Sequence, residues 1–217
     1  MKGLILKDFI NLKKNLKIFG VLTLLYGFMS YTSGDASFFS TIFTMLFAIL
    51  TLSLYSYDEM AKWDGYAITM PISKENIVQG KYLMMILLTF IGAVFGFLFA
   101  ALMYITAGMN SLLQSIESCG IGAAVVILFY SIALPFITKL GVEKARLIFF
   151  AVYMIPFAII FLINKEIKAG KLVISDNFVE LVNYLERYLG IIIPVVVLLA
   201  LGISYTISLN IYRHKEF

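Results

Sequence analysis

Residues 57–83, YDEMAKWDGYAITMPISKENIVQGKYL, interrupt two long apolar segments with seven charged residues, one tryptophan and one proline. Each charged side chain costs about 3 kcal/mol at the centre of a bilayer, whereas each large apolar residue gains about 0.5 kcal/mol. The stretch is therefore expected outside the membrane core, as a connection between two membrane-spanning helices.

The composition of the whole chain is that of a membrane protein. Its 217 residues are 61% hydrophobic and 14% charged, with a mean hydropathy of +0.95, whereas soluble domains are about 45–50% apolar and about 25% charged. The single cysteine, Cys119, excludes an internal disulfide framework. The net charge is +4, but the basic residues do not form a clustered face of the kind that binds nucleic acid. No nucleic-acid partner is therefore expected.

The apolar segments predict an all-α membrane protein with six spans. A hydrocarbon core about 30 Å thick requires about 20 predominantly apolar residues per helix. The segments that meet or approach this length are 18–33, 37–57, 82–106, 119–138, 147–164 and 189–212. We treat residues 1–217 as one transmembrane domain.

The distribution of basic residues predicts the orientation, because Lys and Arg are enriched in cytoplasmic connections. Thirteen of the 17 lie in the N-terminal segment, in residues 57–83, between the fourth and fifth spans, or at the C-terminus. The other four lie in residues 165–188, where apolar residues recur at helical spacing. We expect both termini and residues 57–83 to be cytoplasmic, and residues 165–188 to form an amphipathic helix at the outer interface.

Residues 1–17 have the pattern of an amphipathic helix. Met1, Ile5, Phe9, Leu12 and Leu16 lie near one face, and the lysines lie off it. A lysine close to anionic lipid contributes about 1 kcal/mol. We expect this helix to lie along the inner membrane surface.

The six apolar cores contain no Asp, Glu, Lys, Arg or His, which argues against an ion-coupled carrier. One histidine and one cysteine do not supply a metal site, and no nucleophile has a basic partner at membrane depth, so we expect neither a metal nor a catalytic residue. The chain has no phosphate-binding loop, because Gly80-Lys81 is followed by Tyr82. Any ATP used must be hydrolysed by another chain.

Local signals divide residues 57–83 into two helices and a turn. Residues 58–66 are predicted to form a short helix that continues from the second span and stops near Gly65. Proline disfavours helix in the residue before it, so Met70-Pro71 predicts an extended bend. Ser73 is expected to cap the next helix, with Glu75 in its first turn.

Residues 70–83, MPISKENIVQGKYL, and the opening MKGLILKDFINLKKNL resemble the type-2 ABC transporter permeases. In that family, a six-helix subunit begins with a cytoplasmic amphipathic helix. The connection between its second and third spans carries a coupling helix, followed by a pattern like lPvsr..iv.gKyl. Lys74 stands where the family often has arginine. The layout of the whole chain fits this family.

The resemblance implies that a coupling region, residues 58–81, docks on a separate ATPase subunit that binds ATP and Mg, with a smaller contact between the fourth and fifth spans. It implies two ATPase subunits and a second permease subunit, identical or paralogous. The implied docking residues are Asp58, Glu59, Lys62, Trp63, Asp64, Tyr66, Pro71, Glu143, Lys144 and Arg146. On residue chemistry alone, the aromatic residues among them fit an interfacial belt equally well, and the last three fit a polar turn.

Two further sets of residues are assigned to packing and to an outer gate. Gly92, Gly96 and Ala100 share a helical face that lets another helix approach, either within the chain or across a dimer. In related permeases, an element before the last span closes the exit, which makes Phe178, Leu181 and Leu185 gate candidates. A passive interfacial helix is the plainer account of that segment.

The uncharged interior favours an amphipathic or hydrophobic cargo. Together with the resemblance, it predicts a permease of the bacterial cytoplasmic membrane that exports a membrane-active peptide or a drug; some relatives export toxic peptides. The alternative is a stand-alone immunity or sensor protein that binds its ligand in the bilayer without an ATPase.

Overall fold

A computed structural model describes residues 2–33, 36–108, 112–145, 147, 154, 158, 159, 161, 162, 165 and 176–215. The elements are α1 (Lys2–Leu12), the 3-10 turn η1 (Lys13–Asn15), α2 (Leu16–Ser33), α3 (Ala36–Met60), α4 (Trp63–Thr69), α5 (Lys74–Ala107), α6 (Leu112–Leu140) and α8 (Asp176–His214). These described residues contain no strand. The predicted all-α class is confirmed.

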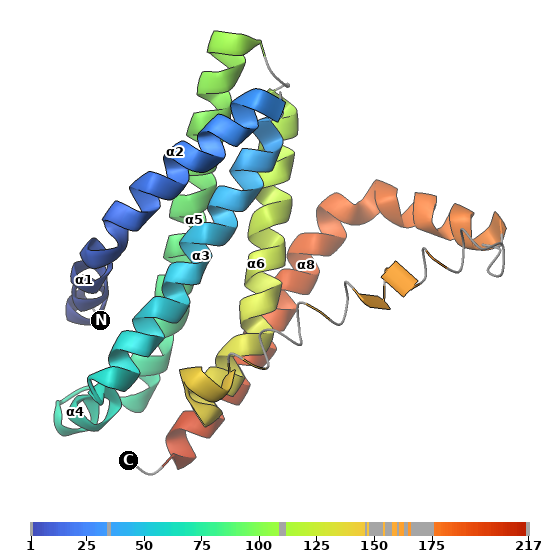
Figure 1. Ribbon diagram of the computed structural model, residues 1–217. Helices are drawn as coiled ribbons and strands as arrows, with labels where there is room; N and C mark the ends of the chain where they lie inside the picture. The colour runs from blue at the N-terminus through green and yellow to red at the C-terminus, as the bar shows by residue number, and fades with distance from the viewer. Residues whose placement is uncertain are drawn as a thin grey trace.

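The long helices form a bundle whose two ends differ (Figure 1). The chain runs up through α2, down through α3, up through α5 and down through α6, and α8 descends beside α6. The N-terminus, α4 and the C-terminus therefore lie at the same end, which we call the basic end. This is the arrangement expected when two termini and one connection share one side of a membrane.

Four helices are long and apolar enough to cross a membrane: Phe39–Met60, Lys74–Thr106, Leu113–Leu140 and Tyr188–His214. They correspond to the second, third, fourth and sixth predicted spans, so a multi-pass membrane protein is confirmed. The first predicted span lies in α2, an 18-residue helix that is not among these four. The fifth, 147–164, lies largely outside the described residues. Six spans therefore remain a prediction.

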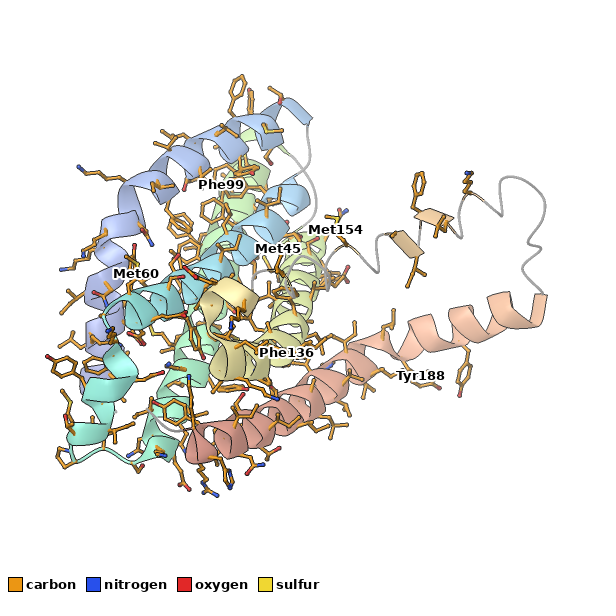
Figure 2. The ribbon with its side chains drawn as sticks, turned by 60° about the horizontal axis from the view of Figure 1, so that its bottom comes forward. Met45, Met60, Phe99, Phe136, Met154 and Tyr188 are labelled. Atoms are coloured by element: carbon orange, nitrogen blue, oxygen red, sulfur yellow. The ribbon has the colours of Figure 1, made fainter. Side chains whose placement is uncertain are left out.

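The last span and part of the predicted outer helix form one element. α8 runs without a break from Asp176 to His214, although the sequence predicts a boundary near residue 188. Its N-terminal part, around Tyr188, extends away from the other helices (Figure 2). Pro194 lies inside α8, and a proline inside a helix bends it without necessarily ending it. Figure 1 shows that α8 changes direction along its length.

The predicted packing face of α5 contacts α3 of the same chain. A Cβ atom added to Gly96 would lie 2.8 Å from the backbone oxygen of Ser40, and one added to Gly92 would lie 2.7 Å from Cβ of Phe47. Ala100, on the same face, is fully buried. Small residues on α5 therefore let α3 approach closely within one chain.

Candidate functional site

The helical conformation of the chain is interrupted after α3, at Lys62. This residue adopts a left-handed conformation (φ 49°, ψ 38°), which ends α3 at Met60 and lets α4 begin at Trp63. The prediction of one helix over residues 58–66 that stops near Gly65 differs from this, because Gly65 lies inside α4. Glycine weakens a helix by about 1 kcal/mol relative to alanine but does not end it, whereas a left-handed residue does.

The rest of the connection follows its local signals. Met70 is extended (φ −85°, ψ 156°), as expected before Pro71. Ser73 caps α5, since its side-chain oxygen accepts a hydrogen bond from the backbone N–H of Asn76 at 3.2 Å. Glu75 lies in the first turn of α5. The predicted cap is confirmed.

One face of α4 is held against the bundle. Ala67 is fully buried, and Trp63 is half-buried against the core. The Lys7 Nζ atom of α1 lies 4.3 Å from the centroid of the Trp63 ring. An ammonium group at this distance is attracted by the face of the indole, so α1 helps to position α4.

The same lysine joins α1 to the end of α3. Its Nζ atom lies 2.5 Å from Oδ1 of Asp58, which is 9% exposed, and 3.2 Å from Oδ1 of Asp8. Burial raises the pKa of the Asp8 carboxyl, Lys7 opposes this shift, and the negative charge of Asp58 adds to it. Two carboxylates therefore share one ammonium group where α1 crosses α3.

The face of α1 that packs on the bundle is not the predicted apolar face. Leu4, Asp8 and Leu12 are buried, whereas Phe9 is 39% exposed and Ile5 is half-buried. Phe9 and Ile5 are left at least partly exposed, so contact of the predicted apolar face with the inner membrane surface stays a prediction. Sequence reasoning missed both Lys7 and Asp8.

Asp64 joins α4 to two spans. Its Oδ1 atom accepts hydrogen bonds from Nζ of Lys81 on α5 at 3.3 Å and from the hydroxyl of Tyr212 on α8 at 3.2 Å. Nζ of Lys215 lies 4.0 Å from Oδ2. These groups line a small cavity of about 80 Å³ at the basic end. The two hydrogen-bond donors, Lys81 and Tyr212, are 17 and 148 positions from Asp64 along the chain, so no local pattern reveals them.

Glu59 joins α3 to the second predicted contact. Its Oε2 atom accepts a hydrogen bond from the backbone N–H of Val142 at 2.7 Å. Gly141 adopts φ +82°, and a Cβ atom there would lie 2.5 Å from Oε1 of Glu59. A glycine therefore permits both the turn and the close approach of the carboxylate.

The predicted docking residues divide into two groups. Asp58, Trp63 and Asp64 contact other parts of the chain through the interactions above, and so does Glu59, although it is exposed. Lys62, Tyr66, Pro71, Glu143 and Lys144 are exposed, as are Glu59 and its neighbour Met60. Arg146 lies outside the described residues. We call the outward set Met60, Lys62, Tyr66 and Pro71 the α4 surface; Met60 is 83% and Tyr66 66% exposed.

The gate candidates lie far from the α4 surface. Phe178, Leu181 and Leu185 belong to the N-terminal part of α8, which lies away from the basic end (Figure 1), and their side chains lie outside what the structure describes. Their role stays a prediction.

Polar contacts also occur between two spans. The hydroxyl of Tyr82 on α5 lies 2.6 Å from Oγ of Ser204 and 2.8 Å from Oγ of Ser208, both on α8. Nε2 of Gln79 donates to the hydroxyl of Tyr205 at 3.1 Å. Within the described residues, no group of three His, Cys, Asp or Glu side chains is placed to hold a metal.

Comparison with known proteins identifies the family. A family model described as an ABC-2 family transporter protein matches residues 3–213. No curated protein and no solved structure matches the chain. The match covers α1, the connection around α4 and the spans from α3 to α8. The chain therefore belongs to the ABC-2 family of transporter proteins.

Proposed function

We propose that this chain is the membrane-spanning subunit of an ABC exporter and that the α4 surface docks on a separate ATPase. ABC-2 permeases are membrane transport components that are not themselves catalytic and normally work with ATPase subunits. The observation that carries the proposal is the contrast between the two faces of α4, one held to the bundle and one exposed.

The exposed face has the chemistry of a protein contact. Tyr66 and Met60 offer large apolar areas of the kind that anchor interfaces. Lys62 and the exposed Glu143 and Lys144 add charges that can set the register of a partner. A partner docked here would lie outside the membrane, as an ATPase must.

The held face supports transmission of force. Asp64 bonds to α5 and α8, and Glu59 bonds to the start of the next connection. A displacement of α4 would therefore act on two spans, and a displacement of the adjoining end of α3 would act on the second predicted contact. This is what a coupling helix requires.

The complete transporter would contain two ATPase subunits, each binding ATP and Mg, and two permease subunits, identical or paralogous, each with six spans. It would lie in the bacterial cytoplasmic membrane with both termini cytoplasmic. The apolar surfaces of the described spans support an amphipathic or hydrophobic cargo, such as a membrane-active peptide or a drug.

The test is co-purification with a candidate ATPase encoded beside this chain. We expect wild type to retain the ATPase and the double variant Met60→Ser/Tyr66→Ala to lose it. Changes at Trp63 or Asp64 would disturb internal contacts as well, so they make poorer probes. The matched control is Tyr104→Ala, an exposed tyrosine near the opposite end of the bundle.

Equal retention by wild type and the double variant would refute docking at the α4 surface. Retention by neither, with the protein folded, would favour the stand-alone immunity or sensor protein.

A further inference from the structure

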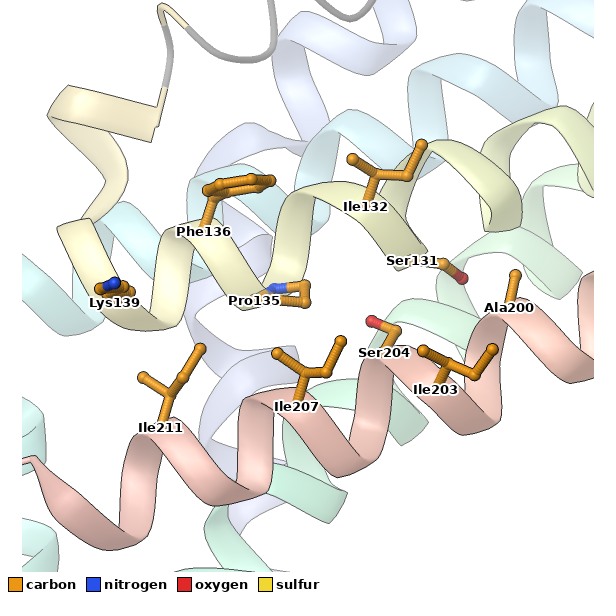
Figure 3. A pocket seen from close by; sticks show the side chains of 10 residues that line it. All are labelled: Ser131, Ile132, Pro135, Phe136, Lys139, Ala200, Ile203, Ser204, Ile207 and Ile211. Carbon is orange, nitrogen blue, oxygen red and sulfur yellow. The ribbon is translucent and has the colours of Figure 1, made fainter.

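A groove about 480 Å³ in volume runs between α6 and α8. Ile132, Pro135 and Phe136 line one side, and isoleucines of α8, including Ile203 and Ile207, line the other (Figure 3). Several of these side chains are about half exposed: Ile132 49%, Phe136 41% and Ile207 46%. Both walls belong to helices that are long and apolar enough to cross a membrane, so the groove lies within the membrane-spanning part of the bundle.

The polar groups at one end of the groove need no ligand. The Oγ atom of Ser131 donates to the backbone oxygen of Ile127 at 2.8 Å, and Oγ of Ser204 bonds to the hydroxyl of Tyr82. Because both hydroxyl groups are already hydrogen-bonded within the protein, a ligand at this end contacts a surface that behaves as an apolar one. An uncharged hydrocarbon chain is the complementary group.

The other end of the groove carries a cation. Lys139 lies about 12 Å from Ser131 along α6, at 1.5 Å per residue, and Figure 3 shows it at the opposite end of the groove, near Ile211. It is exposed and lies in the last turn of α6, at the basic end. A helix C-terminus favours a charged lysine.

Neighbouring cations have carboxylate partners. Arg213 pairs with Glu75, and Lys215 lies 4.0 Å from Asp64 and donates to the backbone oxygen of Thr138. Among the described residues, Lys139 has no such partner. Its ammonium group is therefore available to an anion at the membrane surface.

We propose that the groove binds one anionic phospholipid, with an acyl chain between α6 and α8 and the phosphate at Lys139. The volume lies within the range of about 300–1,000 Å³ typical of ligand pockets. Basic sites between membrane helices bind anionic lipid headgroups. Because none of the described acidic residues pairs with Lys139, its charge favours phosphatidylglycerol over phosphatidylcholine, whose headgroup carries its own positive charge.

The test places a fluorophore in the groove of the full-length chain. Cys119→Ser removes the single cysteine, and Ile207→Cys accepts the label. The protein is placed in phosphatidylcholine nanodiscs that contain a nitroxide on the acyl chain of either phosphatidylglycerol or phosphatidylcholine. We expect half-maximal quenching by the labelled phosphatidylglycerol at an about five-fold lower mole fraction, which corresponds to about 1 kcal/mol for one lysine.

Matched variants separate a site from bulk lipid. Lys139→Gln is expected to abolish the preference and Lys139→Arg to keep it. Lys144→Gln removes another exposed lysine near the basic end and is expected to leave the preference unchanged. A label introduced by Leu98→Cys, on an exposed position of α5, is expected to be quenched equally by both lipids.

Three results would overturn the proposal. Equal quenching by both lipids at position 207 would show that bulk lipid fills the groove. A preference that survives Lys139→Gln would place the headgroup elsewhere. Absence of quenching by either lipid would show that protein, such as a second copy of this chain, covers the groove. None of these measurements requires the ATPase, so they are independent of the proposed function.

Discussion

Gly96→Ala is expected to weaken the contact between α3 and α5. The added Cβ atom would lie 2.8 Å from the oxygen and 2.9 Å from the Cα atom of Ser40, and these backbone atoms cannot rotate aside as the end of a side chain can. Overpacking costs about 1–3 kcal/mol, and a contact with backbone belongs in the upper part of that range. Alanine regains about 1 kcal/mol of helix propensity. The net loss in the free energy of unfolding is therefore about 1–2 kcal/mol.

The single cysteine provides the assay. Cys119 is 7% exposed, and its Sγ atom lies 3.5 Å from the backbone oxygen of Ala93, where α6 meets α5. A thiol-reactive dye will label it when the bundle opens on heating. One kcal/mol shifts the midpoint by about 2–4 °C in a chain of this size, so Gly96→Ala should lower it by about 2–8 °C.

The matched control is Gly202→Ala. Gly202 lies inside α8, and a Cβ atom there would have no neighbour within 4 Å, so this variant should be as stable as wild type or gain up to about 1 kcal/mol. If Gly96→Ala unfolds at or above the wild-type midpoint, the reasoning from close packing is wrong. A change in oligomeric state without a lower midpoint would instead place this face at a dimer contact.

Three further predictions concern polar groups. Asp8→Asn should raise the midpoint of thermal unfolding at neutral pH, because burial raises the pKa of this carboxyl and so disfavours its charged form in the folded chain. The difference in midpoint between the variant and wild type should shrink as the pH falls through the raised pKa. Thermal melts at a series of pH values would measure it. Tyr82→Phe removes the hydrogen bonds to two serines of α8 and should lower the free energy of unfolding by about 0.6–1.7 kcal/mol, measured in the same melt. An unchanged midpoint would show that these hydrogen bonds do not stabilise the bundle. Glu59→Gln removes the carboxylate that accepts a hydrogen bond from the backbone N–H of Val142, so hydrogen exchange of that amide should become faster. An unchanged exchange rate would show that the contact does not protect the amide.

Local sequence signals predicted the features that depend on neighbouring residues. Charge placed residues 57–83 at the end of the bundle rather than within it, and Ser73 marked the start of α5. The motif in residues 70–83 led to the family that the comparison confirmed. Hydropathy located four spans, because length and apolar content act within one helix.

Features that depend on distant partners were not predictable in the same way. The positions of Trp63 and Asp64 against the bundle depend on Lys7, Lys81 and Tyr212, which lie on three other helices. The helix is interrupted at Lys62, which adopts a left-handed conformation, and not at Gly65, where the local sequence predicted its end. Propensity describes each residue in isolation, whereas tertiary contacts decide which strained conformation is held.

The sequence by itself therefore determined the class, the family, the location of four spans and the start of α5, because hydrophobicity and capping act over a few residues. Only the tertiary structure decided which face of α4 is free, that the glycine face of α5 contacts α3, and that Lys139 ends a groove between α6 and α8. Each of these depends on residues brought together from separate helices, and the energies that select them arise only when the helices pack.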